Sequence, residues 1–340
     1  MEKIESVLVL INPVSGRRDG EGLIVEANAF KYGLAKRVGL KMFVEKTSSN
    51  GGTIEIARQA ARMGIKVILS VGGDGTAHEI VNGLLMSGIS IEKLPLIIVV
   101  PNGNGNDLAR HFGYPKGQGL KWAFRVLTSE EPLRYARIAV IDIGDATCLK
   151  NDEVIQRYFI STLSLGEDAK INNNALDLRR KYPFLSLAGK GVYVFAAVPE
   201  LLSFWKKLNY PRLRVEMDGG NPFEISVVIG VVGNGGEYGG IFRPAPCASM
   251  EDGWLDVCFI LPMGKGEILP NLVRFCLGTH VSNDKVLKVE GILPRAQLLH
   301  ISSEDDFLVQ MDGEIFSGMK ELEITVKPKA IRLLVPNPGS

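Results

Sequence analysis

The stretch that decides the fold is KVILSVGGDGTAHEIVN, residues 66–82. It begins with β-branched and apolar residues, continues with the glycine-rich turn of residues 72–76, and ends with apolar residues at helical spacing. This order predicts a strand, a tight turn and a helix. Glycine lets the backbone adopt positive φ and come close to a ligand. The amides of this turn, with the N-terminus of the following helix, are therefore suited to a polyphosphate.

Asp74 is the unusual residue of this turn, because a carboxylate beside a phosphate is repelled unless a cation lies between them. We therefore expect Asp74 to contact Mg²⁺ directly or through water. The glycine spacing is neither that of the GxxxxGK[ST] phosphate loop nor that of the GxGxxG dinucleotide turn. The alternative is a plain glycine turn in which Asp74 caps the helix.

Residues 1–137 alternate apolar strands with amphipathic helices. Strands are expected at residues 7–11, at 40–44, before the glycine turn and at 96–100. This alternation predicts a Rossmann-like, three-layer α/β domain with a parallel sheet covered on both faces. Because ligands bind outside the carboxyl ends of such strands, the loops after all four strands should gather along one rim.

Residues 138–327 have a different pattern, with short, often alternating strands separated by Gly, Pro, Asn and Asp. Strands are expected at 158–165 and 286–289, among others, and toward the tail at 322–326 and 331–335. The pattern predicts a β-sandwich-like domain with helical insertions at about 185–205 and 265–276. The fold class is thus α/β followed by β, with the boundary near residue 137 and the site expected in the cleft between the domains. The tail, about residues 328–340, is expected to pack back on the first domain.

Composition excludes several classes of protein. The 340 residues carry 39 basic and 38 acidic side chains, a formal net charge of +1, which gives no global attraction to nucleic acid. The four cysteines lie far apart without a CxxC pair, which argues against zinc or disulfides and for a reduced, cytoplasmic environment. No window holds about 18 uninterrupted apolar residues, so no transmembrane segment is expected.

The second domain supplies three further motifs. A glycine-dense turn, GNGGEYGG, occupies residues 233–240 and is equally compatible with a plain connection. Glu251-Asp252-Gly253 is a common turn signal that could also provide a carboxylate for a hard cation. Asp312-Gly313-Glu314 places two carboxylates around a glycine at the end of a strand, suited either to proton transfer or to a solvated hairpin tip.

In combination these motifs resemble the diacylglycerol kinase catalytic-domain superfamily, which includes sphingosine and ceramide kinases and bacterial lipid kinases. The resemblance covers essentially the whole chain. It runs in the family's order through the following motifs: NPVSG (12–16), GGDGTAHEIVNGL (72–84), PNGNGNDLAR (101–110), LGEDA (165–169), GNGGEYGG (233–240), EDGWLDV (251–257) and QMDGE (310–314).

The resemblance implies which residues bind the nucleotide, hold the metal and carry the reaction. Glu314 matches the family's proton acceptor, with Asp312 beside it and Asp74 at the phosphates. Asp252, with the backbone carbonyls of Ser249 and Trp254, resembles its magnesium site. The nucleotide-contacting positions implied are Asn12, Pro13, Val14, Ser15, Gly16, Thr47, Gly72, Gly73, Asp74, Gly75, Thr76, Ala77, His78 and Asn104.

Two departures from the family's pattern affect this assignment. Asn104 stands where the family usually has Thr, which changes the hydrogen-bonding geometry toward a nucleotide. Ile241 follows Gly239-Gly240 where a third consecutive glycine is usual, so the edge of the lipid site is expected to differ in shape.

The expected function is therefore transfer of the γ-phosphoryl group of ATP to a lipid hydroxyl, diacylglycerol-like or sphingoid, with Mg²⁺. The alternatives are an NAD kinase-like enzyme of the same fold and a non-catalytic nucleotide- or lipid-binding homologue. The motifs leave open the lipid, its acyl chains, and the choice between monomer and homodimer.

A lipid kinase without a membrane span must still reach its substrate. We expect a cytoplasmic protein at the inner membrane face. The basic and apolar residues 179–184 are a candidate contact with an anionic lipid surface. A solvated basic edge of a packed helix is an equally good explanation of this segment.

Overall fold

The computed structural model describes residues 4–16, 19–47, 51–103, 105–150, 153–166, 211–240 and 242–338. The chain forms two compact units. Unit 1 contains Met1–Ile143 and Lys327–Ser340, and unit 2 contains Gly144–Val326. The sequence placed the boundary near residue 137. Because strands β5 and β14 begin in one unit and end in the other, the boundary falls within a strand, where composition carries no signal.

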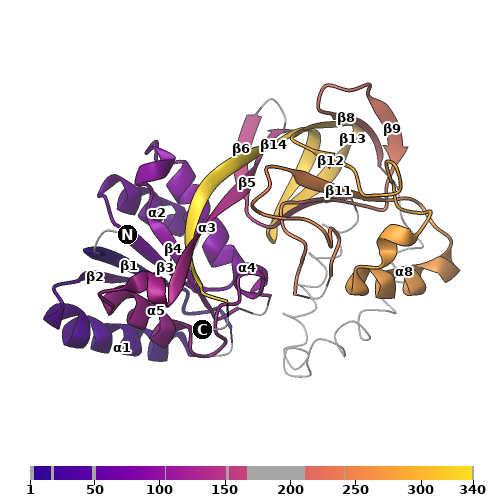
Figure 1. Ribbon diagram of the computed structural model, residues 1–340. Coiled ribbons are helices and arrows are strands. Elements are labelled where there is room, and N and C mark those ends of the chain that lie inside the picture. Colours follow the sequence, from indigo (N-terminus) through magenta and orange to yellow (C-terminus); the bar gives the residue numbers. More distant parts are fainter. Residues whose placement is uncertain are drawn as a thin grey trace. The chain divides into compact units, whose positions relative to one another are not determined.

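Unit 1 is built on a parallel sheet in the order β14-β4-β3-β1-β2 (Figure 1). Leu333 of β14 pairs in parallel with Ile97 of β4, so the C-terminal strand extends this sheet. The two central strands are apolar because helices cover both their faces, and every residue of β3 is buried. The strands are β1 (Ser6–Ile11), β2 (Lys41–Lys46), β3 (Val67–Gly72), β4 (Leu96–Pro101) and the end of β14 (Glu314–Pro336).

The helices of unit 1 form a layer on each side of this sheet. Helices α2 and α3 pack closely at Gly83. A Cβ at this position would lie 2.2 Å from the carbonyl oxygen of Ile54, so a larger residue would not fit. The end of α1 meets α5 through Phe30 and Phe124, whose stacked rings are 3.7 Å apart. The helical segments are α1 (Gly20–Phe30), η1 (Lys31–Ala35), α2 (Gly52–Arg62), α3 (Asp74–Leu85), η2 (Ile91–Lys93), α4 (Asp107–His111), α5 (Gly119–Thr128) and η3 (Pro132–Arg134).

Unit 2 is made mainly of antiparallel strands. The long strand β13 is irregular between Ser302 and Phe307; its first part pairs with β8 and its last part with β7. The elements are β5 (Ala136–Lys150), β6 (Glu153–Phe159), β7 (Thr162–Gly166), β8 (Arg212–Met217), β9 (Phe223–Ser226), β10 (Ile229–Gly233), β11 (Leu255–Ile260), α8 (Lys265–Leu277), η6 (His280–Ser282), β12 (Arg295–Ala296), β13 (Leu298–Met311) and β14.

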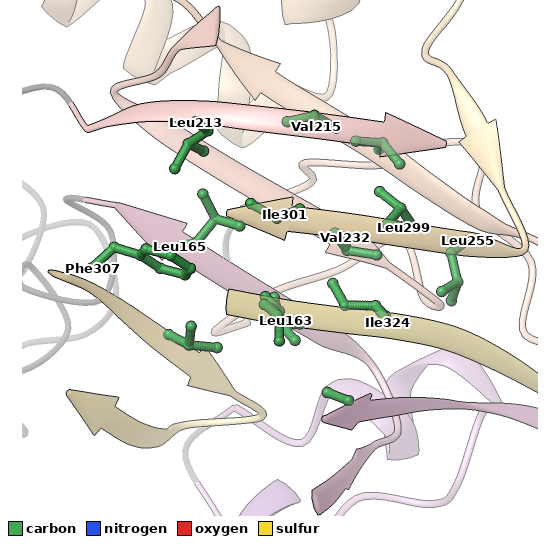
Figure 2. Packing of buried hydrophobic residues seen from close by; sticks show 14 of the residues in the cluster. Leu163, Leu165, Leu213, Val215, Val232, Leu255, Leu299, Ile301, Phe307 and Ile324 are labelled. Carbon is green, nitrogen blue, oxygen red and sulfur yellow. The ribbon is translucent and has the colours of Figure 1, made fainter. Parts of the chain in front are cut away.

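The core of unit 2 is formed by apolar side chains that alternate along the strands. They come from β7, β10 and β11 and from β8, β13 and β14 (Figure 2). Leu163 and Leu165 of β7 enter this core together with Leu213 and Val215 of β8. A second, smaller cluster lies on the other side of β10 and β11 and includes Phe275 of α8. Two layers of strands around one core confirm the predicted β-sandwich-like fold.

Three sequence-based assignments differ from the observed elements of unit 2. Residues 286–289, expected to be a strand, form only isolated bridges. Residues 158–165, expected to be one strand, are divided between β6 and β7. The expected strands at 322–326 and 331–335 are both part of the single strand β14. The predicted helix at 185–205 lies outside the described residues.

Candidate functional site

The loops after β1, β3 and β4 are joined by side-chain hydrogen bonds at the carboxyl ends of the strands. Asn12 Nδ2 donates to Thr76 Oγ1 at 3.2 Å, which connects the NPVSG loop to the GGDGT turn. Asn102 Nδ2 donates to the carbonyl oxygen of Ser15 at 2.8 Å, which connects the NPVSG loop to the Asn-Gly loop. The strand-end loops therefore form one connected rim, as the parallel sheet predicts.

Glycines make this close approach of the backbones possible. Gly16 has φ +80°, and a Cβ there would lie 1.2 Å from the carbonyl oxygen of Asn102. A Cβ on Gly103 would lie 2.4 Å from Cα of Gly73. No side chain fits at either position, so the glycines bring the amides of separate loops together.

The remaining nucleotide-contacting candidates differ in exposure. Val14 is 92% exposed, whereas Ala77 and His78 are buried within α3. His78 Nε2 lies 3.3 Å from Asn82 Nδ2. The backbone N–H of Thr47 donates to the carbonyl oxygen of Ile11 at 2.9 Å, and Thr47 therefore sits at the same rim.

The other positions of this set lie on the rim or outside the described residues. Pro13 is in the NPVSG loop, and Gly72, Gly73, Gly75 and Thr76 are in the GGDGT turn and the first turn of α3. Asn104 and Ile241 lie outside the described residues, as does the basic segment 179–184. A nucleotide role for each of these positions stays a prediction.

Asp74 and Asp107 direct their carboxylates toward one point on the rim of unit 1. The position that a Cβ of Gly105 would occupy lies 2.6 Å from Asp74 Oδ2 and 3.8 Å from Asp107 Oδ1. Asp74 Oδ1 also accepts a hydrogen bond from the backbone N–H of Leu108 at 3.3 Å. Two carboxylates beside a glycine suit a hard divalent cation. The sequence analysis missed Asp107, although the NDLAR motif contained it.

Arg110 supports this arrangement from the next turn of α4. Its guanidinium pairs with the Asp107 carboxylate and donates to the carbonyl oxygen of Gly105. Asp107 is almost fully buried. A buried carboxylate needs such a partner, and Arg110 therefore fixes both Asp107 and the glycine loop.

In unit 2, Asp312 holds the DGE turn against the link between β6 and β7. Its carboxylate accepts backbone hydrogen bonds from Ile160 at 2.6 Å, Ser161 at 2.9 Å and Thr162 at 3.1 Å. Asp312 itself has φ 47°, a left-handed conformation that Asp tolerates better than most residues. These contacts indicate that Asp312 positions the turn that carries Glu314.

Glu314 lies beside Arg157 of β6. The Glu314 Oε2 atom is 3.9 Å from Arg157 Nε, and the Glu314 side chain is 45% exposed. The same guanidinium lies 5.8 Å from the ring centroid of Phe316. Arg157, which the sequence analysis did not single out, therefore restricts the orientations open to the Glu314 carboxylate.

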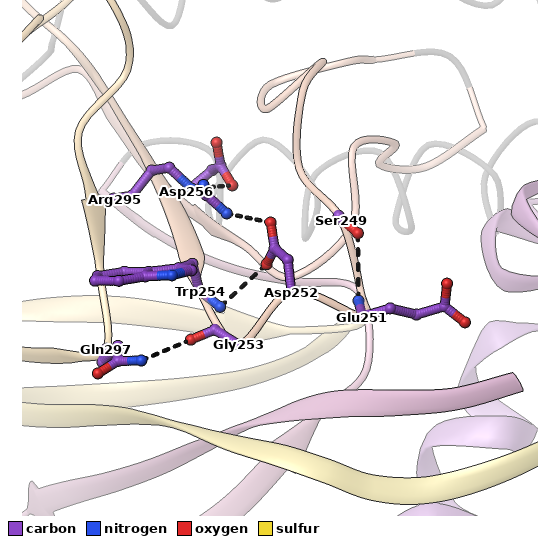
Figure 3. Close-up of polar contacts among 8 residues, drawn as sticks. All are labelled: Ser249, Glu251, Asp252, Gly253, Trp254, Asp256, Arg295 and Gln297. Carbon is purple, nitrogen blue, oxygen red and sulfur yellow. Dashed lines mark hydrogen bonds and ion pairs between the residues drawn. The ribbon is translucent and has the colours of Figure 1, made fainter.

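The EDG turn is closed by an arginine (Figure 3). Asp252 Oδ1 accepts from the backbone N–H of Trp254 at 3.1 Å, and Asp252 Oδ2 pairs with Arg295 of β12. The Arg295 guanidinium also lies 5.7 Å from the Trp254 ring centroid and 3.5 Å from Asp256 Oδ2. Ser249 Oγ accepts from the backbone N–H of Glu251 at 3.3 Å.

Asp256 is the buried member of this cluster. Burial raises its pKa to about 6, while Arg295 opposes the shift and the nearby Asp252 charge adds to it. One guanidinium therefore offsets two carboxylates. Asp252 Oδ1 accepts one backbone N–H and Oδ2 faces Arg295, so Mg²⁺ at this side chain would share the carboxylate with a guanidinium. The magnesium site that the sequence suggested at Asp252, with the carbonyls of Ser249 and Trp254, stays a prediction.

Two further features concern ligands and membranes. Unit 2 has a groove of about 430 Å³, and none of the predicted site residues lines it. The residues that line this groove are Thr147, Cys148, Leu149, Val154, His300, Ile301, Ser302, Glu321, Leu322 and Glu323. Among the described residues, none of the helices has the length and apolarity that crossing a bilayer requires.

Comparison with known families matches both units. Residues 6–139 match the diacylglycerol kinase catalytic domain, and residues 161–335 match the YegS C-terminal NAD kinase beta sandwich-like domain. A diacylglycerol kinase of Bacillus subtilis is 25% identical over 334 residues, which span 96% of this chain and 95% of that protein. The match thus includes the segments that carry the rim of unit 1 and the DGE turn of unit 2.

Solved structures agree on the fold. A diacylglycerol kinase from Bacillus anthracis aligns with a TM-score of 0.66 and 18% identity, covering 99% of this chain and 98% of that one. A yeast NADH kinase crystallised with NADH aligns with a TM-score of 0.52 and 11% identity, covering 99% of this chain and 85% of that one. At these identities the alignments support the two-unit architecture and carry no information on substrate.

Proposed function

Because this chain belongs to the diacylglycerol kinase and YegS-like lipid kinase family, we propose that it transfers the γ-phosphoryl group of ATP to the hydroxyl of a lipid. The observation that carries the proposal is the rim of unit 1. Hydrogen bonds join its strand-end loops, the N-terminus of α3 lies among them, and Asp74 and Asp107 converge beside Gly105. Amides with paired carboxylates suit a triphosphate accompanied by a cation.

In the proposed reaction, the bond between the γ-phosphorus and the oxygen bridging to the β-phosphate breaks as the lipid hydroxyl oxygen bonds to that phosphorus. ADP leaves with the bridging oxygen. The hydroxyl proton passes to Glu314, late in a loose transition state. Asp312 positions Glu314 through its three backbone hydrogen bonds.

Mg²⁺ is the cofactor that this reaction requires. Asp74 and Asp107 are the residues that would hold it, and when bound it neutralises charge on the phosphate oxygens. The amides of the GGDGT turn, with the first amides of α3, would bind the phosphates, because the amides of a helix's first turn have no partners within the helix. Asn12 and Asn102 keep these loops in register.

The proposal is tested by incubating the protein with labelled ATP and Mg²⁺ in the presence of hydroxyl lipids, of NAD, or of neither. Product identification by mass distinguishes the lipid kinase from an NAD kinase-like enzyme. If phosphorylated lipid forms, the enzyme has reached its lipid substrate at the surface of a membrane or micelle. If no phosphoryl transfer occurs to any acceptor, the protein is a binding homologue and the proposed reaction is wrong.

Glu314→Gln separates chemistry from binding. We expect kcat to fall by about a hundredfold, without rescue at higher pH, because glutamine cannot accept the proton. Nucleotide affinity should be unchanged, because Glu314 has no role in binding ATP in this mechanism. An unaltered kcat would return the DGE turn to a structural role.

A further inference from the structure

Strand β2 is the open edge of the parallel sheet of unit 1 (Figure 1). Among the described residues it pairs with β1 alone. The backbone N–H of Lys41 donates to the carbonyl oxygen of Glu5 on the β1 side at 3.0 Å. The odd-numbered residues of β2 thus direct their backbone groups toward β1. The N–H and C=O groups of Met42, Val44 and Lys46 therefore point to the open edge.

The side chains of β2 do not block this edge. Lys41, Phe43 and Glu45 are exposed on one face of the strand, and the large apolar Phe43 is 43% exposed. Lys41 and Glu45 lie about 13 Å apart along the strand, too far to pair with each other. The strand is a regular one without proline, and its register with β1 is continuous. An edge of this kind is a template for a further strand.

Hydrogen bonding restricts the registers in which two copies of β2 could pair. Residues opposite each other in an antiparallel pair must both face the partner or both face away, so even-numbered residues must lie opposite even-numbered ones. The register centred on Phe43 meets this condition. It places Phe43 opposite Phe43, and the two-fold symmetry places each Lys41 opposite the Glu45 of the other copy.

Neighbouring registers lack this complementarity. Centring the pair on Met42 also satisfies the hydrogen bonding but sets Phe43 opposite Lys41. Centring it on Val44 sets Phe43 opposite Glu45. Neither register brings Lys41 and Glu45 face to face. The charges of β2 therefore select a single register for self-pairing.

We propose that β2 is a dimerisation edge, which pairs antiparallel with β2 of a second copy of this chain in the register centred on Phe43. Opposite charges and aromatic side chains directly across an antiparallel pair are stabilising, whereas like charges there are destabilising. Charges that protected the edge from self-pairing would oppose like charge to like charge in this register. A single strand pair is a small interface, so we expect a dissociation constant on the order of micromolar.

The first test reverses the charges. Wild type should form a concentration-dependent dimer in analytical ultracentrifugation between about 1 and 100 μM. Lys41→Glu and Glu45→Lys each set like charges face to face twice, and each should weaken the dimer by about tenfold or more. An equimolar mixture of these two variants should dimerise as wild type does, because Lys and Glu then face each other at both positions. Glu130→Lys is the control, an exposed charge reversed outside β2, and should leave the dimer unchanged.

The second test examines the register with a disulfide. In the proposed pair the two Phe43 Cα atoms lie about 4.5 Å apart, within the range that a disulfide spans. The Cys247→Ser background removes an exposed thiol. In that background Phe43→Cys should crosslink into a dimer on mild oxidation. Lys41→Cys is the control and should not, because the two copies of position 41 lie about 13 Å apart.

Every outcome bears on the proposal. Wild type that stays monomeric at about 100 μM would overturn it, and the open edge would then belong to a strand of another protein. A dimer that both charge reversals leave intact, or one that crosslinks equally from positions 41 and 43, would place the interface elsewhere. Recovery of the dimer in the mixture excludes misfolding as the cause of its loss. These measurements need no substrate, so failure of the proposed function would leave the inference standing.

Discussion

The carboxylate of Asp312 accepts the backbone N–H of Ile160 at 2.6 Å, across 152 positions of sequence. Oδ1 of the same side chain accepts the backbone N–H groups of Ser161 and Thr162, so both carboxylate oxygens accept hydrogen bonds. This relationship makes one acidic residue of the DGE turn a structural anchor. Glu314, the other, has a half-exposed side chain and serves the proposed reaction.

Asp312→Asn should therefore destabilise unit 2. The amide retains one acceptor oxygen for Ser161 and Thr162, but its NH₂ group faces the N–H of Ile160, and two donors then oppose each other. We expect a loss of roughly 1.5–3 kcal/mol in the free energy of unfolding, measured by urea denaturation. Glu314→Gln is the matched control on the same turn and should change that free energy by less than about 0.5 kcal/mol. Equal stabilities for the two variants would contradict the division of roles.

Asp74→Asn tests the rim of unit 1. Asparagine retains the acceptor for the Leu108 N–H, so the fold should be intact, but the negative charge beside the proposed cation is lost. We expect kcat to fall by at least about a hundredfold, roughly 3 kcal/mol of barrier, with an unchanged Tm. Asp218→Asn is a suitable control, because Asp218 Oδ1 accepts the backbone N–H groups of Gln297 and Leu298 in a similar way. Near-normal turnover in the Asp74 variant would remove that residue from the mechanism.

Asp256 makes stability depend on pH in a definite direction. Its pKa in the folded protein is about 6, against an ordinary value of 3.8. Between these values the folded state binds more protons than the unfolded chain, so stability falls as pH rises through this window. Asp256→Asn removes the effect. The free energy of unfolding of the variant minus that of wild type should therefore rise by about 1–2 kcal/mol between pH 4 and pH 7. Urea denaturation across this range measures it, and a pH-independent difference would contradict the assignment.

The sequence predicted the strand-turn-helix of β3 and α3 and the parallel sheet because strong local signals and the tertiary fold agree there. Glycines at residues 72, 73 and 75 and buried β-branched residues before them leave few alternatives. The sandwich was predicted only in outline. The irregularity in β13 between Ser302 and Phe307 depends on pairing with two different strands, and no local pattern records such pairing.

The site was predictable to the extent that its residues lie in recognisable motifs. Motif positions identified Asp74, Asp252 and Glu314 but gave no partners. Arg157 and Arg295 come from segments without a motif, and they approach Glu314 and Asp252 only after the strands have paired. That the two sets of residues meet in one cleft stays a prediction.

Arg295 is expected to make the EDG turn independent of divalent metal. If its guanidinium supplies the positive charge beside Asp252 and Asp256, Asp252→Asn should leave the Tm difference between EDTA and millimolar Mg²⁺ the same as in wild type. Arg295→Met leaves both carboxylates without their cation. It should lower the free energy of unfolding by about 1–2 kcal/mol, and added Mg²⁺ or Ca²⁺ should restore part of this loss.

Arg212→Met is the control for the loss of an arginine from an exposed ion pair, because Arg212 pairs with Glu224 on β8 and β9, where both side chains are largely exposed. This variant should change stability by less than about 0.5 kcal/mol, and its response to metal should match that of wild type. A Tm difference between EDTA and Mg²⁺ that is present in wild type and lost in Asp252→Asn would show that a cation binds at Asp252. The cation and the guanidinium would then share the Asp252 carboxylate, which has lone pairs for both.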